Sequence, residues 1–197
     1  MNYIEFWDNN HKNKSDLWLS SSYTGEDILN LHSINKNISG LDILDLGIGV
    51  GNLTTFLSLK NNVYACDISE VALDNVKNIA KTYNSKYLKN IEPVDLAISN
   101  LVFQHCNDKE VERFINDINL KPNGIFSFQF AFLRENEEPK QFVKNYIQKN
   151  THFFRPLATI LDYVEKSNKK ILSISEPIHH YGPENFSWYI VKITNKS

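Results

Sequence analysis

Short apolar runs alternate along the chain with longer stretches in which apolar residues recur every three or four positions. The short runs predict buried strands, and the periodic stretches predict amphipathic helices. This alternation predicts an α/β fold, a doubly wound and mostly parallel sheet with helices on both faces. The predicted strands are 41–46, 63–66, 94–99, 125–130, 171–175 and 187–194, and the predicted helices are 24–34, 52–60, 69–83, 109–120 and 156–167.

The link between the last two predicted strands, residues 176–186, is too short for a crossover connection. The last strand should therefore run antiparallel to its neighbour. In parallel sheets, ligands bind beyond the carboxyl ends of the strands. We therefore expect a ligand at the turns that follow residues 46, 66, 99, 130 and 175.

Two segments lie outside this alternation. Residues 1–23 are polar with interspersed aromatic side chains, which predicts an N-terminal arm. Residues 131–156 are a polar and aromatic insertion after the fifth strand, where a lid over a bound substrate would lie. A single domain over residues 1–197 accommodates both segments.

Charge and cysteine content narrow the function classes. The chain has 21 Lys and Arg residues against 23 Asp and Glu residues, which argues against a large phosphate-backbone footprint and so against a nucleic-acid partner. Its two cysteines have no CxxC spacing, which is typical of a reducing compartment. The N-terminal residues lack an apolar signal core, and no apolar run is long enough to span a membrane. These features predict a cytoplasmic protein without a membrane partner, and they leave its oligomeric state open.

Three of the seven glycines lie within five positions, directly after the first predicted strand. Gly47, Gly49 and Gly51 allow a tight turn and a close approach of a ligand to the N–H groups of the following helix. Dinucleotide sites use the spacing G-x-G-x-x-G, which would need a glycine at position 52. Asn52 stands there instead, and Asp45 lies two residues before the first glycine. The glycine spacing therefore argues against a dinucleotide as the ligand.

The pattern Asp45-x-Gly47-x-Gly49-x-Gly51 resembles motif I of the class I S-adenosylmethionine-dependent methyltransferases. Asp67, at the end of the second predicted strand, matches the acid with which this family holds the ribose. Residues 94–105 resemble the family's fourth strand and following loop, and residues 120–128 resemble its turn into strand five. The resemblance implies a Rossmann-like fold, S-adenosyl-L-methionine as cofactor and S-adenosyl-L-homocysteine as product.

The resemblance also implies roles for individual residues. Asp45 and the glycine backbone would hold the methionine end of the cofactor, and Asp67 would accept hydrogen bonds from both ribose hydroxyls. Ile68 would pack on the adenine, while Asn100 and Leu101 would border the sulfonium. The predicted cofactor-binding residues are thus Asp45, Gly47, Ile48, Gly49, Gly51, Asp67, Ile68, Asn100 and Leu101.

One part of the family pattern has little room in this chain. Only about ten residues separate the predicted helix 69–83 from the strand at Val94, and they must supply a third strand. Residues 86–88 are the candidate for a short strand, with Lys89 or Asn90 beside the adenine. The adenine contact of residues 84–93 is not assigned further.

Methyl transfer depends mainly on positioning two reactants, and it needs a base only when the attacking group is still protonated. His105, after the fourth strand, is the predicted catalytic residue, with a structural histidine as the alternative. Arg155, in the predicted lid, could pair with a phosphate or carboxylate of the acceptor. The predicted substrate-binding residues are Gln104, Arg155, His179, His180 and Tyr181. The histidines lack the spacing of metal ligands, so no metal is predicted.

The small size of the chain favours an enzyme that methylates an oxygen or nitrogen atom of a small molecule. An arginine in the lid would favour an anionic acceptor, such as a sugar derivative or a phosphorylated amine. A protein or RNA methyltransferase is the nearest alternative. A second alternative is a non-catalytic regulator or partner subunit that binds S-adenosylmethionine, because binding alone does not establish turnover.

Overall fold

The structure is a computed structural model that describes residues 3–13, 23–133, 153–179 and 186–196. The chain divides into two compact units. The first comprises residues 1–98 and 118–124, and the second comprises residues 99–117 and 125–197.

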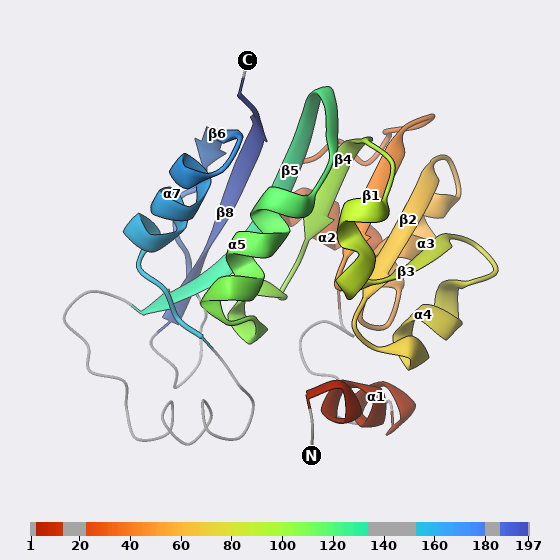
Figure 1. Ribbon diagram of the computed structural model, residues 1–197. Helices are drawn as coiled ribbons and strands as arrows, with labels where there is room; N and C mark the ends of the chain where they lie inside the picture. Colours follow the sequence, from red (N-terminus) through yellow and green to blue (C-terminus); the bar gives the residue numbers. More distant parts are fainter. Residues whose placement is uncertain (1–2, 14–22, 134–152, 180–185, 197) are drawn as a thin grey trace. The chain divides into compact units, whose positions relative to one another are not determined.

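The first unit holds four parallel strands in the order β3-β2-β1-β4 (Figure 1). Their side chains form an apolar core, in which Ile43, Leu44 and Ala65 are at most 1% exposed. The strands are β1 (Asp42–Leu46), β2 (Asn62–Asp67), β3 (Lys81–Asn84) and β4 (Val94–Ser99). Parallel neighbours place their carboxyl ends at one edge, so the turns after β1 and β2 lie side by side.

Side-chain caps fix the start of two of the four helices in the first unit. Thr24 and Asp27 form a capping box, in which each side chain accepts from the other residue's backbone N–H. The side chain of Ser69 caps the helix Glu70–Val76, because its hydroxyl accepts a hydrogen bond from the N–H of Ala72. The helices are α1 (Tyr3–Asn13), α2 (Gly25–Leu31), α3 (Asn52–Ser58) and α4 (Glu70–Val76).

The predicted helix over 69–83 is wrong in its second half. Helix α4 ends at Val76, whose carbonyl accepts from the N–H groups of Ile79 and Ala80 in a turn. Residues 81–84 then form β3, which pairs with β2. The strand lies at the edge of its sheet, and its side chains are exposed or half-buried, so it carries no apolar run that would mark it. Residues 86–88, predicted as a strand, belong to the 3-10 helix Ser85–Asn90.

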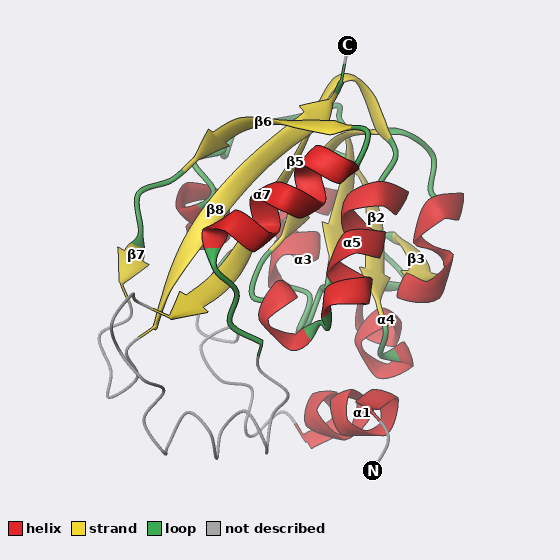
Figure 2. Cartoon of the chain, turned by 60° about the vertical axis from the view of Figure 1, so that its left-hand side comes forward, coloured by secondary structure: helices red, strands yellow, loops and turns green. Residues whose placement is uncertain are grey.

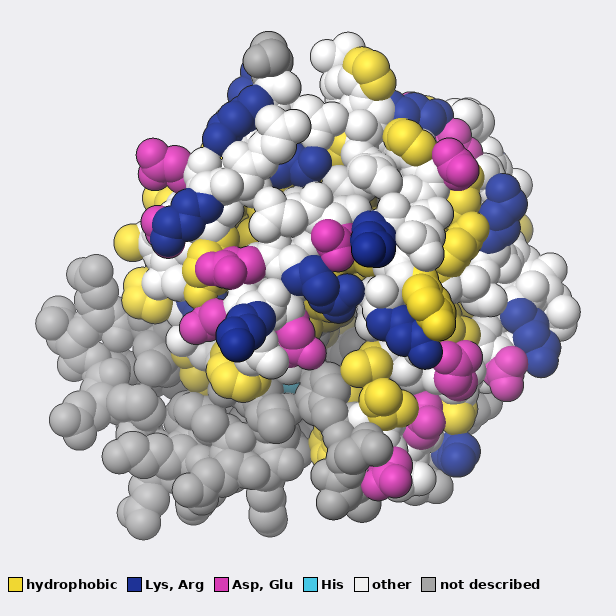
Figure 3. Space-filling model, in the orientation of Figure 1, with side chains coloured by type: hydrophobic (Ala, Val, Ile, Leu, Met, Phe, Trp, Pro, Cys, Tyr) yellow, Lys and Arg dark blue, Asp and Glu magenta, His cyan; other side chains and the backbone are white. Residues whose placement is uncertain are grey.

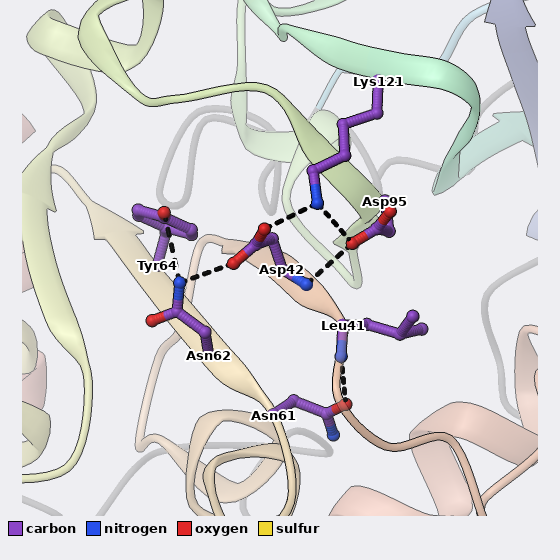
Figure 4. A network of polar contacts seen from close by, with 7 residues as sticks. All are labelled: Leu41, Asp42, Asn61, Asn62, Tyr64, Asp95 and Lys121. Atoms are coloured by element: carbon purple, nitrogen blue, oxygen red, sulfur yellow. Dashed lines mark hydrogen bonds and ion pairs between the residues drawn. The ribbon is translucent and has the colours of Figure 1, made fainter.

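A polar network links the starts of β1 and β4 (Figure 4). The Nζ of Lys121 lies 2.6 Å from Oδ2 of Asp42 and 2.9 Å from Oδ2 of Asp95. The backbone N–H of Asp42 donates to the same Asp95 oxygen, and the Asn62 amide donates to Asp42. These contacts with Lys121 lower the pKa of both carboxyls. The network therefore stabilises the end of the sheet opposite the glycine turn.

The second unit is built on antiparallel pairing of β8 (Phe186–Asn195) with β5 and β6. Strand β5 runs over Leu120–Leu133 and enters this unit at Ile125, while β6 spans Lys169–Ile174. The prediction of an antiparallel last strand is confirmed. A two-residue strand, β7 (Ile178–His179), also pairs with β8 inside the segment predicted as a loop.

Helices α5 (Asp108–Asp117) and α7 (Leu157–Lys166) lie together over one face of these strands (Figure 2). The rings of Phe103, Phe126 and Phe128 form the centre of the packing, and each ring is fully buried. Phe103 and Phe128 stack with ring centroids 4.7 Å apart. Aromatic pairs of this kind add to the stability that burial of their area provides.

The mostly parallel α/β fold with antiparallel C-terminal strands agrees with the predicted fold class. Strand β5 begins at Leu120 rather than at Ile125, and Asn123 takes a left-handed φ of 65°. Asparagine tolerates this conformation better than other residues with a side chain. Most of the predicted lid, residues 134–152, lies outside the described residues. The lid and the single-domain organisation stay predictions.

Candidate cofactor and acceptor sites

The turn after β1 requires glycine for two different reasons. Gly47, Gly49 and Gly51 all have left-handed φ angles, of 80°, 56° and 86°. A Cβ atom at Gly51 would lie 2.6 Å from Cγ1 of Val76, so packing against α4 excludes a side chain there. A Cβ atom at Gly49 would have no heavy atom within 4 Å. The turn therefore packs tightly at its end and borders open space at Gly49.

Asp45 is buried beneath this turn, with 3% of its surface exposed. Its Oδ2 accepts a 2.6 Å hydrogen bond from the Thr54 hydroxyl on α3. The pKa of Asp45 is raised to about 7, mainly by burial and also by the nearby carboxylate of Asp67, while the Thr54 hydrogen bond opposes the rise. A cationic group entering the site would favour the ionised form of this acid.

Asp67 ends β2 and is also buried. One carboxylate oxygen accepts from the N–H of Ser69 at 2.9 Å, and the other accepts from the N–H of Gly49 at 3.3 Å. Burial raises its pKa, while these hydrogen bonds and the imidazole of His11 oppose that rise. The Gly49 contact joins the two turns, so the two predicted acids and the open space at Gly49 belong to one site.

Two isoleucines predicted to bind the cofactor, Ile48 and Ile68, have different surroundings in the structure. The side chain of Ile48 packs in the core between β2 and α4, with Ala65 and Leu73, so only its backbone belongs to the glycine turn. Ile68 is half-buried and directly follows Asp67, a place compatible with packing on a base.

The end of β3, not residues 86–90, lies beside Asp67. Asn84 pairs with Asp67 in the parallel register, and its side-chain amide donates to Glu70 at 2.8 Å. The Asn119 amide instead binds the carbonyls of Lys89 and Ile91, at the start of β4. The predicted place of Lys89 or Asn90 beside the adenine stays a prediction. Asn84 is the first of residues 84–93, the region whose adenine contact the sequence left unassigned.

Helix α1 adds residues to this site that the sequence did not assign. The Ser69 hydroxyl donates a 2.6 Å hydrogen bond to Asp8, which docks α1 at the start of α4. His11, one turn further on, is 5% exposed and interacts electrostatically with both Asp67 and Asp8. Its ring stacks on Trp7 with centroids 6.1 Å apart. The available signal was the aromatic spacing of Tyr3, Phe6 and Trp7, which is helical rather than that of an irregular arm.

In the second unit, the segment after β4 has a specific and strained backbone. Leu101 has a φ of 58°, an uncommon conformation for a leucine. Its N–H donates a 3.1 Å hydrogen bond to Oε1 of Gln129 on β5. Its side chain packs against Ala131 and Trp188. Strain of this kind persists where surrounding contacts enforce it, and it often marks functional sites. Asn100, which precedes it, is half-buried.

The predicted acceptor residues Gln104 and His105 adjoin this segment within the 3-10 helix Phe103–His105. Gln104 is buried, and its Oε1 accepts a 3.0 Å hydrogen bond from the Trp188 indole. Its Nε2 lies 3.4 Å from Nε2 of His105, which is half-buried. Gln104 therefore orients neighbouring side chains, while the catalytic role of His105 stays a prediction.

Arg155 differs from its predicted role. The side chain is 5% exposed, and its Nε donates to Asp108 at 2.8 Å. Its other nitrogens donate to the carbonyls of Phe103 and Cys106. The guanidinium thus holds the 3-10 helix and the start of α5 together. These contacts support a structural role, and the predicted contact of Arg155 with an acceptor stays a prediction.

The remaining acceptor prediction concerns the segment after β6. The backbone of His179 lies in β7, opposite Ser187 of β8. The His179 side chain, His180 and Tyr181 lie outside what the structure describes. Their predicted contact with an acceptor is therefore untested.

Further features of the described residues are the arrangement of potential metal ligands, the apolar character of the helices and the distribution of charge. Within the described ranges, no cluster of three or more His, Cys, Asp and Glu side chains is arranged to hold a metal ion. No described helix combines the length and apolar character needed to cross a membrane. In Figure 3, coloured Lys and Arg side chains are interspersed with Asp and Glu over the visible face.

Comparison with known proteins matches part of both units to a protein family and matches the fold to solved structures. Residues 44–128 match a family model described as a methyltransferase domain. The chain is similar to magnesium protoporphyrin IX methyltransferase from Synechocystis PCC 6803 with bound SAH, at 15% identity over 100% of this chain and 89% of that one, with a TM-score of 0.64. A comparison with curated protein sequences finds no match.

Two other solved structures have the same fold. Geranyl diphosphate C-methyltransferase from Streptomyces coelicolor A3(2) is 9% identical, over 87% of this chain and 75% of that chain, with a TM-score of 0.64. Phosphoethanolamine N-methyltransferase 2 from Haemonchus contortus, in complex with S-adenosyl-L-methionine, is 16% identical, over 88% of this chain and 52% of that chain, with a TM-score of 0.66.

Proposed function

We propose that the chain is a class I S-adenosylmethionine-dependent methyltransferase and that it transfers a methyl group to an oxygen or nitrogen atom of a small-molecule acceptor. The match of residues 44–128 to a methyltransferase domain and the similar fold of solved methyltransferases support this proposal. The observation that carries the cofactor half of this proposal is the space at Gly49, next to two buried acids. A buried carboxylate is costly unless a partner compensates its charge or its hydrogen-bonding capacity. S-adenosylmethionine offers both a cationic end and two ribose hydroxyls.

The residues present fit this cofactor at three points. The ionised form of Asp45 would attract the cationic methionine end, beside the backbone of the glycine turn. Asp67 retains acceptor capacity after binding two backbone N–H groups, because a carboxylate has about four lone-pair sites. It would take the ribose hydroxyls there. Ile68, adjacent to Asp67, would cover the adenine.

The bound cofactor would supply an electrophilic methyl group on a good leaving group. The protein then needs to place the acceptor in line with that methyl group and to exclude water. Leu101 and Trp188 form an apolar wall that suits this task in the second unit. His105 would take a proton from the acceptor where the acceptor is still protonated, since imidazole titrates near neutral pH.

The acceptor is proposed as a class only. Geranyl diphosphate and phosphoethanolamine, named for two similar structures, both carry phosphate, which supports testing anionic acceptors. Arg155 no longer supports that choice, because internal partners occupy it. An acceptor screen should therefore pair each phosphorylated amine or sugar derivative with its unphosphorylated form. Methylated product from one member would also exclude the non-catalytic alternative.

The cofactor site can be tested by calorimetry with S-adenosyl-L-homocysteine. Asp67→Ala removes the proposed ribose contacts and should weaken binding by about 2–4 kcal/mol. Asp74→Ala is a matched control, because that carboxylate is on the same unit and its side chain is 71% exposed. Equal affinity in the wild type and Asp67→Ala would show that the ribose assignment is wrong. No binding by the wild type at millimolar ligand would overturn the cofactor site altogether.

A further inference from the structure

Helix α1 carries a buried polar atom to which no described residue forms a hydrogen bond. Nδ1 of His11 is buried and has no hydrogen-bond partner among the described residues. The residue as a whole is only 5% exposed. Buried polar atoms are nearly always satisfied, so an exception calls for a specific explanation. One explanation is a partner that arrives with a ligand.

The position of His11 indicates which ligand that is. It lies one turn after Asp8, which accepts from the Ser69 hydroxyl, and the Ser69 N–H in turn binds Asp67, the residue proposed to bind the ribose. The charge of Asp67 correspondingly acts on the pKa of His11. The Asp67 carboxylate accepts two hydrogen bonds from the backbone N–H groups of Ser69 and Gly49, and neither of these comes from the imidazole of His11. A hydroxyl group that binds Asp67 would therefore also lie near His11.

The helix holds His11 in place by contacts on both sides. Asp8 accepts from the Ser69 hydroxyl, and Ser69 is the residue whose backbone N–H binds Asp67. Trp7 stacks on the imidazole ring, with an angle of 27° between the planes. In Figures 1 and 2, α1 lies beside α4, at the end of the unit where β2 finishes. The side chain is thus fixed by its neighbours rather than free to turn away.

We propose that His11 is a binding residue for the adenosine half of the cofactor, through Nδ1. The inference rests on the proposed function, since it places the ribose at Asp67. Neutral imidazole has one nitrogen that donates and one that accepts, so it suits a hydroxyl group, which can do both. Burial lowers the pKa of His11 and so favours this neutral form near pH 7.

The decisive variant is His11→Leu, which removes the polar atom and keeps an apolar side chain against Trp7. We expect calorimetry to show at least a tenfold increase in the dissociation constant for S-adenosyl-L-homocysteine. The melting temperature without ligand should stay the same or rise, because an unsatisfied buried group disappears. Asn9→Ala, at an exposed position of the same helix, should change neither quantity. Unchanged binding by His11→Leu would overturn the proposal.

A second variant keeps the test valid if His11→Leu does not fold. His11→Asn places an amide near the position of Nδ1 and should retain more affinity than His11→Ala. Equal binding by His11→Asn and His11→Ala would show that hydrogen bonding at Nδ1 plays no part.

The ligand can be varied as well as the protein. 5′-Methylthioadenosine contains the adenosine half and lacks the amino acid. The fold-loss caused by His11→Leu should be similar for this ligand and for S-adenosyl-L-homocysteine. A loss confined to S-adenosyl-L-homocysteine would place His11 at the methionine end and overturn the assignment.

The failure of this inference can be distinguished from the failure of the proposed site. If Asp67→Ala weakens binding and His11→Leu does not, the ribose site stands and the role of His11 falls. If neither variant changes the affinity, both assignments are wrong.

Discussion

The hydroxyl of Thr54 donates a 2.6 Å hydrogen bond to the carboxylate of Asp45, and both side chains are buried. This contact opposes the desolvation that raises the pKa of Asp45 to about 7. The acid is consequently close to half-protonated at neutral pH in the free protein. Two measurable consequences follow, one for ligand binding and one for stability.

Cofactor binding should release a proton near pH 7. A cationic methionine end favours ionised Asp45, so affinity should rise between about pH 6 and pH 8. Calorimetry in buffers of different ionisation enthalpy would measure the proton released. Thr54→Val removes a hydrogen bond that lowers the pKa of Asp45, so the pH dependence should shift upward. A proton count of zero across this range would contradict the assignment.

The free protein should lose stability as pH rises from about 4 to about 7. The folded state holds the Asp45 proton more tightly than the unfolded state, whose pKa is near 3.8. Above pH 7, the full cost is on the order of 4 kcal/mol. Asp45→Asn should therefore raise the melting temperature at pH 8 while it weakens binding. The gain should be smaller at pH 5, where the wild-type acid is protonated.

Alanine substitutions at two glycines of the same turn should act on different properties, one mainly on stability and the other mainly on ligand binding. Gly51→Ala places a Cβ atom 2.6 Å from Val76, so it should cost about 2–4 kcal/mol of stability. Gly49→Ala meets no clash and should cost about 1–2 kcal/mol through its left-handed φ. Its methyl group enters the proposed ligand space, so binding should fall at least tenfold. Denaturant unfolding and calorimetry on both variants test this contrast.

Arg155 should be a stability residue. Arg155→Ala removes the guanidinium donor of the Cys106 carbonyl and leaves the Phe103 carbonyl with the Cys106 N–H, which should cost about 2–4 kcal/mol. Asp108→Ala removes a partner whose side chain is 68% exposed and should cost under about 1 kcal/mol. Lysine at position 155 should not restore stability, because it lacks the planar fork. Equal melting temperatures for wild type and Arg155→Ala would contradict this role.

The network of Lys121 with Asp42 and Asp95 should act in acid with the opposite sign to Asp45. Hydrogen bonds from Lys121 lower the pKa of both carboxyls, so their contribution to stability is present above pH 4 and is lost below it. Lys121→Met should lower the melting temperature at pH 7. This difference from the wild type should shrink with added salt and largely vanish at about pH 3. A constant difference from pH 7 to pH 3 would show that the charges do not matter.

The sequence alone determined the features whose chemistry is local. Asp45, the glycine turn and Asp67 each occupy a place defined by the end of one strand, so spacing was enough to predict them. The antiparallel last strand was likewise predictable from the length of one link. Such features depend on a few consecutive residues, because turn geometry and strand periodicity are short-range.

Only the tertiary structure decided the features that join distant segments. Arg155 binds Asp108 across 47 positions of sequence, and no local pattern marks an arginine as internally paired. Strand β3 is polar and lies at an edge, so its pairing with β2, rather than its own sequence, makes it a strand. His11 meets Asp67 because Asp8 and Ser69 dock α1 beside α4. These outcomes depend on which surfaces pack together, and burial and pairing between segments cannot be read from either segment alone.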